Sequence, residues 1–248
     1  MDRISAADLV GDVSTEAPFG AGGTDAAERR VRIPDYLRDT YSWAYLNPRS
    51  VCLLDTPLVV HGILWGNFNR LVSAALAEFE PGLRVLQPAC VYGNLSARLA
   101  AKLGPRGHLQ VSDVAPVQIA NCAPKLEGAA NTRLCLSDAA DHPARSFDAV
   151  CCFFLIHEVP AEHRRRIVDT LLRAVKPGGK IVFVDYHAPR GWHPLKPVMS
   201  LVFDTLEPFA KDLWRAEIRD FAADAGRFRW SKTTYFGGLY QRVVAEAV

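Results

Sequence analysis

The stretch VLQPACVYGN, residues 85–94, joins a short apolar run to a loop and then to a helical pattern. Leu95, Leu99 and Leu103 follow the loop at helical spacing, and Gly104 ends their pattern. A strand, a glycine-containing loop and a helix in this order are typical of the first unit of a nucleotide-binding α/β fold. The stretch therefore predicts a sheet that is wound with helices and that holds a ligand at this loop.

Alternating apolar runs and amphipathic segments continue beyond this unit. The runs end at Asp113, at Asp138, near His157 and at Asp185, and helical patterns separate them. The last two runs, within residues 228–248, are joined by a short turn, so they must pair antiparallel. We expect an α/β fold with a Rossmann-like, mostly parallel sheet, one antiparallel strand and helices on both faces.

The chain divides into three segments by composition. Residues 1–30 are rich in Gly, Ala, Asp and Thr, which predicts a disordered tail. Residues 31–80 carry many aromatic side chains and predict a helical lid that contributes to a substrate site, whereas residues 81–248 predict the sheet domain. With 248 residues, 49% of them hydrophobic, the chain is long enough for one large domain but not for two.

Charge and hydropathy exclude several classes of partner. The net charge is +2 and no long Lys/Arg tract occurs, so we expect no nucleic-acid binding; Arg164, Arg165 and Arg166 are interpreted as a solvated helix face. No apolar stretch reaches the length of a membrane span, and the first thirty residues lack the apolar core of an export signal. These patterns predict a cytoplasmic protein whose contact with a membrane is peripheral.

Polar residues close the predicted strands, at the sheet edge where doubly wound folds bind ligands. Asp113 ends the second strand, where a ribose-binding acid is expected. An aspartate that caps the next helix is the alternative interpretation of Asp113, and it applies equally to Asp138. Both interpretations stay open at the level of sequence.

Three features together resemble the class I methyltransferases that bind S-adenosylmethionine: LIHEVP after the fourth strand, the KPGG turn, and the closing antiparallel pair. The resemblance covers residues 83–246. It implies that S-adenosylmethionine is the cofactor and that Asp138 and Ala139 lie against its adenine. The cofactor-binding residues that we predict are Gln87, Ala89, Val91, Tyr92, Gly93, Asp113, Val114, Asp138, Ala139 and Phe154.

The loop departs from the pattern of that family, which has an acid followed by three alternating glycines. Gln87 replaces the acid, Ala89 and Val91 replace two glycines, and Gly93 remains. Side chains in place of glycines change how closely the backbone approaches a ligand. A decayed, non-catalytic binding module and a changed way of holding the cofactor both explain this departure.

A closer resemblance combines VLQPACVYGN with SWAYLNP and LWGNFNRL upstream. All three resemble the RquA family, the methyltransferase-like family of rhodoquinone biosynthesis. The resemblance implies conversion of ubiquinone to rhodoquinone, in which an amino group from S-adenosylmethionine replaces a quinone methoxy group with the assistance of manganese. A methyltransferase that acts on a quinone or another small aromatic compound is the alternative.

Amino transfer gives the replacement of the acid a chemical purpose. A carboxylate beside the cofactor amine would favour the charged ammonium form, and the neutral Gln87 removes that effect. We assign catalytic roles to His157, Tyr92 and Asp185. His157, Glu158, Asp185 and His187 are candidate ligands for Mn²⁺, although we favour His157 as a base or a substrate contact.

Aromatic residues upstream of the sheet predict a quinone pocket. Tyr41, Trp43 and Tyr45 are its expected substrate contacts, together with His157 and His187. A polyprenyl substrate requires a pocket that opens to a bilayer, and residues 192–214 are a candidate for the bilayer-facing segment. A core helix fits those residues nearly as well, and the sequence predicts no oligomeric state.

Overall fold

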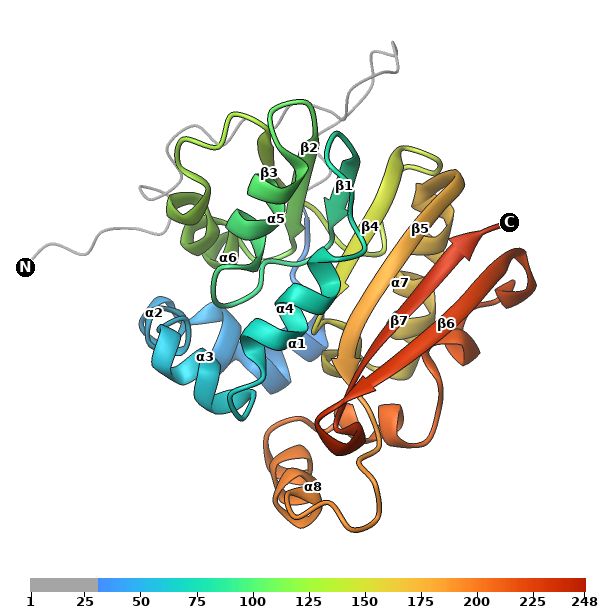
Figure 1. Cartoon of the computed structure of the whole chain (residues 1–248). Helices are drawn as coiled ribbons and strands as arrows, with labels where there is room; N and C mark the ends of the chain where they lie inside the picture. Colours follow the sequence, from blue (N-terminus) through green and yellow to red (C-terminus); the bar gives the residue numbers. More distant parts are fainter. Residues whose placement is uncertain (1–30) are drawn as a thin grey trace, which may run out of the picture.

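The computed structural model describes residues 31–248 (Figure 1). The tail predicted for residues 1–30 lies outside the described residues. Helices occupy most of residues 35–76, and their role as a lid stays a prediction.

A seven-stranded sheet runs through the molecule in the order β3-β2-β1-β4-β5-β7-β6. Strands β1 to β5 are parallel, and β7 alone runs against its neighbours β5 and β6. This confirms the predicted fold class. The strands are β1 (Arg84–Gln87), β2 (His108–Asp113), β3 (Thr132–Leu136), β4 (Phe147–Phe153), β5 (Val175–Tyr186), β6 (Phe228–Tyr235) and β7 (Tyr240–Ala247).

Helices cover both faces of the sheet (Figure 1). One apolar core lies between the sheet and α4, α5 and α6, and a second lies between the sheet and α7. Central strand β4 contributes to both cores, because Cys151 faces one and Val150 and Cys152 face the other. The helices are α4 (Phe68–Leu76), α5 (Leu95–Leu103), α6 (Pro116–Cys122) and α7 (Ala161–Ala174).

Short helices lie at the end of the sheet where the parallel strands finish (Figure 1). Pro48 and Pro57 occupy first-turn positions of α2 and α3. The backbone nitrogen at these positions has no partner within the helix, so proline costs no hydrogen bond there. This group brings residues distant in sequence to the carboxyl ends of the strands. Its members are α1 (Asp35–Tyr41), the π-helical turn Ser42–Leu46, α2 (Pro48–Leu54), α3 (Pro57–Ile63) and, from the other end of the chain, α8 (Lys196–Thr205).

The region predicted as one or two helices after β5 is less regular than expected. It contains α8 and then three short 3-10 turns within residues 210–227. Pro208 explains the end of α8, because a proline disfavours helical backbone at the residue before it. Glu207 is that residue, and it lies outside the helix.

Arg164 corrects the interpretation of the arginine run as a solvated face. Arg165 and Arg166 are exposed, but Arg164 is fully buried. Its guanidinium donates to the carbonyl oxygens of Ile156 (3.0 Å) and Val159 (2.9 Å), and also to the Phe209 carbonyl and the Asp212 carboxylate. A buried arginine therefore joins α7 to the turn after β4 and to the turn after α8.

Candidate functional site

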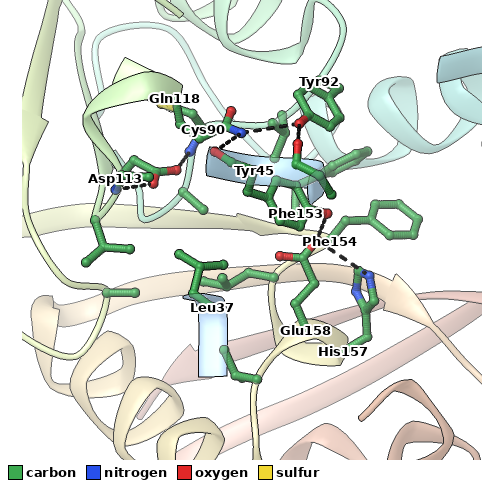
Figure 2. Close-up of a pocket in the computed structure, with 18 of the residues that line it drawn as sticks. Leu37, Tyr45, Cys90, Tyr92, Asp113, Gln118, Phe153, Phe154, His157 and Glu158 are labelled. Atoms are coloured by element: carbon green, nitrogen blue, oxygen red, sulfur yellow. Dashed lines mark hydrogen bonds and ion pairs between the residues drawn. The ribbon is translucent and has the colours of Figure 1, made fainter. Parts of the chain in front are cut away.

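A cavity of about 190 Å³ lies at the carboxyl ends of β1, β2 and β4, where the order of the strands reverses. The short N-terminal helices form its other wall. Figure 2 shows Tyr45 between two polar groups, with Asp113 on one side and His157 with Glu158 on the other. The predicted residues that line the cavity are Trp43, Tyr45, Ala89, Val91, Tyr92, Asp113, Val114, Asp138, Ala139, Phe154, His157 and Glu158.

The remaining predicted residues do not line this cavity: Gln87, Gly93, Tyr41, Asp185 and His187. Gln87 is buried, and its side-chain amide donates to the Ala89 carbonyl (2.8 Å) and to Ser96 Oγ (3.0 Å). The glutamine therefore ties the loop after β1 to α5. In this arrangement Gln87 would affect a bound cofactor only by positioning the loop.

The loop of residues 88–94 is held by the N-terminal helices. The Tyr92 hydroxyl donates to the Ala44 carbonyl (2.5 Å), and its ring stacks on Tyr45 with centroids 5.8 Å apart. The Gly93 amide donates to Asp55 Oδ1 (2.6 Å), and Lys125 pairs with the other oxygen of that carboxylate (2.6 Å). Contacts from outside the loop thus fix a segment that has lost most of its glycines.

Gly93 occupies a position that requires glycine. Its φ of +84° lies in the left-handed region, and a Cβ atom there would lie 2.5 Å from Cζ of Phe68. The retained glycine is explained by backbone conformation and by packing against α4.

Asp113 lies on the side of the cavity formed by the ends of β1 and β2. Its carboxylate accepts from the backbone amides of Cys90 (2.9 Å) and Ala115 (2.8 Å), which links the loop after β1 to the start of α6. Burial raises the pKa of Asp113 to about 6, although the two amides oppose this effect. Asp138 likewise accepts from the Ala140 amide (2.8 Å). Both aspartates therefore brace backbone and line the cavity at once.

The opposite side of the cavity contains a buried histidine and aspartate. Nδ1 of His157 lies 2.8 Å from Oδ1 of Asp185, whose other oxygen accepts from the Ile156 amide (2.9 Å). Burial alone would lower the pKa of His157, but the Asp185 carboxylate outweighs it and the pKa rises to about 9. At neutral pH His157 therefore carries a proton on Nε2, the nitrogen that Asp185 does not contact.

Two glutamates complete this side. Glu158 accepts from the Tyr45 hydroxyl and lies 3.8 Å from Nε2 of His157. Burial raises the pKa of Glu158 to about 8, and the neighbouring Glu207 adds to the shift. Glu207 lines the cavity, and burial also raises its pKa. The sequence analysis missed Glu207; the proline that follows it was the available signal.

Phe154 packs between His157 and the apolar core. It follows β4 with a φ of +50°, which is rare for an aromatic residue and is common at functional sites. Its ring meets His157 and Tyr186 edge to face, with centroids 5.8 Å and 5.2 Å away. The strained backbone places an aromatic wall beside the imidazole.

Three of the predicted manganese ligands, His157, Glu158 and Asp185, are neighbours, but the fourth, His187, is not among them. His187 lies against the Gly238 carbonyl (2.8 Å) and Lys232 Nζ (3.3 Å), outside the cavity. Among residues 31–248 no three His, Cys, Asp or Glu side chains are grouped so that they could hold a metal ion. The donor set therefore does not fit Mn²⁺, and we derive no chemistry from a metal.

Sequence comparison places a methyltransferase domain over residues 85–179. The ubiquinone/menaquinone biosynthesis C-methyltransferase UbiE of Ralstonia nicotianae is 28% identical over 144 residues, which cover 56% of this chain and 58% of that protein. UbiE of Cupriavidus necator is 28% identical over 178 residues, 69% of each chain. The chain thus spans 58% of the length of the Ralstonia protein.

Solved structures give the same fold. An S-adenosylmethionine-dependent methyltransferase from Aquifex aeolicus superposes with a TM-score of 0.53 at 19% identity, over 82% of this chain and 99% of that one. The protein has the class I methyltransferase fold. A second neighbour in shape, a possible exported protein from Bordetella parapertussis, has a TM-score of 0.61 at 17% identity over 86% of this chain and 85% of that one.

The cavity of this methyltransferase fold fits the cofactor that the fold implies. The buried Asp113 and the partly buried Asp138 present carboxylates beside the apolar Val114 and Ala139, a combination that suits an adenosine group. S-adenosylmethionine is therefore the cofactor that the site residues support.

Proposed function

We propose that this protein uses S-adenosylmethionine to modify a quinone ring and that it transfers the amino group of the cofactor, replacing a methoxy group of ubiquinone. One observation carries the proposal: the buried pair of Asp185 and His157 directs a protonated imidazole toward the cavity. The resemblance to the RquA family and the altered loop of residues 88–94 support the same reaction.

Asp113, Val114, Asp138 and Ala139 would hold the adenosine group at the ends of β2 and β3. The bound cofactor would supply the group that is transferred. Val91 occupies a position that is a glycine in the family pattern, and Tyr92 follows it, so the two side chains would reshape the seat of the methionine portion. We expect these two side chains to orient the amino group.

His157 would act on the quinone. The cofactor amine would attack the ring carbon that bears the methoxy group, which moves negative charge onto a carbonyl oxygen, and a donor that already carries a proton stabilises that charge. The methoxy group would leave as methanol, taking up the proton that the amine loses. The bond between the nitrogen and the α-carbon of the cofactor would then break as the quinone ring accepts two electrons and water adds to the α-carbon, which leaves an aminoquinol and an α-keto acid. Asp185 holds Nδ1 of the imidazole, so Nε2 is the donor toward the cavity. Glu158 lies beside Nε2 and accepts from the Tyr45 hydroxyl, so this pair would exchange protons with the reacting groups.

Carbon methylation is the second candidate, because the curated relatives are named as quinone C-methyltransferases. That reaction needs an electron-rich ring, which a base creates by removing a proton from a ring hydroxyl. Glu158, once ionised, is the group placed to serve as that base. The two candidates therefore assign the leading role to different residues of the same cavity.

Doubly labelled S-adenosylmethionine separates the candidates. The cofactor carries ¹⁵N at its amino group and ¹³C at its methyl group. It is offered with ubiquinone in one reaction and, in a second, with a demethylated quinol that has a free ring carbon, each with and without Mn²⁺. Mass spectrometry of the quinone should find nitrogen label and loss of the methoxy group. Carbon label without nitrogen label would establish methylation instead.

A binding module without activity gives a third, separate result. Isothermal calorimetry with S-adenosylhomocysteine should detect binding if the cavity holds the cofactor. No heat of binding, together with no labelled quinone, would support the decayed module.

A further inference from the structure

Large apolar side chains are exposed on α3 and α8, beside the cavity. Leu58 is 84% exposed, Trp192 is 71% exposed and Leu201 is 65% exposed, which is unusual for residues of this size. We define the α3/α8 surface by Leu58, Ile63, Trp65, Trp192, Val198 and Leu201. Both helices lie at the end of the sheet that carries the cavity (Figure 1).

The two parts of this surface are joined. The indole nitrogen of Trp65, which follows α3, donates to the sulfur of Met199 in α8 (3.3 Å). Ile63 belongs to the exposed surface and also lines the cavity with Val60 and Leu64. The apolar wall of the cavity therefore continues onto the α3/α8 surface.

Basic side chains outnumber acidic ones around the surface, and Asp204, the one carboxylate of α8, pairs with Lys211 (2.5 Å). Residues 56–70 and 186–203 contain no Asp or Glu, whereas they contain Arg70, Arg190 and Lys196. Basic side chains around exposed Leu and Trp match an anionic lipid surface, because Trp favours the headgroup region and cations are attracted to anionic lipids. The charge and the apolar side chains thus identify the same partner.

We propose that the α3/α8 surface docks on an anionic lipid bilayer and presents the cavity to a lipid-borne substrate. The proposal rests on the proposed function for the identity of that substrate, and it extends the candidate segment of residues 192–214 to include α3. Among residues 31–248 no helix is long and apolar enough to cross a membrane, so docking would use the side chains of this surface.

Flotation of the full chain with vesicles tests the docking. The vesicles contain equal parts of phosphatidylglycerol and phosphatidylcholine. The double variant Leu58→Ser/Leu201→Ser should lose about ten-fold or more in partitioning, because each leucine would bury apolar surface in the bilayer. Leu136→Ser is the matched control, since Leu136 is 38% exposed on β3 and should partition like the wild type.

Lipid charge and self-association give further outcomes. Lys196→Glu should weaken partitioning into anionic vesicles and leave partitioning into pure phosphatidylcholine unchanged. Wild-type protein that stays unbound, or a double variant that floats as well as the wild type, would overturn the proposal. A wild-type dimer in light scattering that the double variant dissociates would also overturn it, in favour of an interface between two copies.

Activity then separates docking from chemistry. Leu58 and Leu201 do not line the cavity, so the double variant should convert a short-chain, water-soluble quinone at the wild-type rate. Its rate with a polyprenyl quinone in vesicles should fall together with flotation. If the double variant and the wild type convert the vesicle substrate at equal rates, the docking proposal is contradicted. If neither protein converts any quinone but flotation of the wild type is intact, only the proposed function is contradicted.

Discussion

His157 owes its protonation state to a single neighbour, because Asp185 opposes the effect of burial. The His157 pKa of about 9 lies above its unfolded value of 6.5. The ion pair therefore stabilises the fold fully below pH 6.5, and this contribution is lost as the pH rises through about 9. The same titration should remove the donor that the proposed reaction needs.

Asp185→Asn should move this titration. We expect the alkaline limb of the profile of kcat against pH to shift down by about one pH unit or more, because the imidazolium loses its partner. The measurement is kcat between pH 6 and 10 at saturating cofactor. If the alkaline limb does not move in the variant, the titration that causes this limb is not that of His157.

Asp113 predicts a separate pH dependence, at the cofactor. Its pKa of about 6 means that the carboxylate gains a proton as the pH falls through that value. A neutral acid accepts weaker hydrogen bonds from ribose hydroxyls, so affinity for S-adenosylhomocysteine should fall below pH 6.

Asp113→Asn is the test of this assignment. It should weaken binding at pH 8 by roughly 1.5 to 3 kcal/mol and flatten the pH dependence near 6. Calorimetry at several pH values measures both effects. Wild-type affinity in the variant would remove Asp113 from the cofactor site.

At the scale of elements, the loop after β1 requires glycine at position 93. Gly93→Ala and Gly82→Ala both place a side chain at positive φ, but a Cβ at Gly82 would contact nothing within 4 Å. We expect Gly82→Ala to cost about 1 to 2 kcal/mol of unfolding free energy and Gly93→Ala about 1 to 3 kcal/mol more, because of Phe68. Urea titration of the two variants checks the difference; equal losses would rule out the packing constraint.

Asp55, at the C-terminal end of α2, supports that loop. Asp55→Asn should expose the Gly93 amide to faster hydrogen exchange and weaken cofactor binding several-fold, because the carboxylate accepts from that amide and pairs with Lys125. Asp35→Asn, at an exposed position of α1, is the control and should change neither the exchange rate nor the affinity. Unchanged exchange at Gly93 in the Asp55 variant would show that the helices do not restrain the loop.

The elements themselves could be predicted from the sequence, because local periodicity encodes them. The apolar runs that end at Asp113 and near His157 correspond to strands β2 and β4, in the predicted order along the chain. The short turn before Tyr240 required the antiparallel pair. Contacts between distant elements leave no such periodicity. The carbonyl oxygen of Ala44, which receives the Tyr92 hydroxyl, carries no side-chain signature at all.

Arg164 shows the same limit at the scale of the whole molecule. A run of three arginines on an amphipathic helix indicates a solvent-exposed face. The guanidinium of Arg164 nevertheless donates to the carbonyl oxygens of Ile156, Val159 and Phe209. Only the assembled fold brings these carbonyl oxygens to one point. Glu207 reaches the cavity for the same kind of reason.

Arg164→Lys should therefore destabilise the whole molecule. Lysine cannot satisfy several carbonyl oxygens in the arrangement of a guanidinium, so we expect a loss of about 3 kcal/mol in unfolding free energy. Arg165→Lys, on the exposed neighbour, should stay within about 0.5 kcal/mol of the wild type. Urea titration compares them, and similar values for both would show that the buried network contributes little.

The hold of the N-terminal helices on the loop of residues 88–94 has a consequence for how the chain can be divided. The methyltransferase domain match begins at residue 85, but Ala44 and Asp55, which fix the loop, lie before it. A shortened chain that starts at residue 81 would keep every strand and lose about a third of the residues that line the cavity. The smallest autonomous unit of this protein is therefore larger than its conserved-domain match, and separate halves would regain activity only by reassociating.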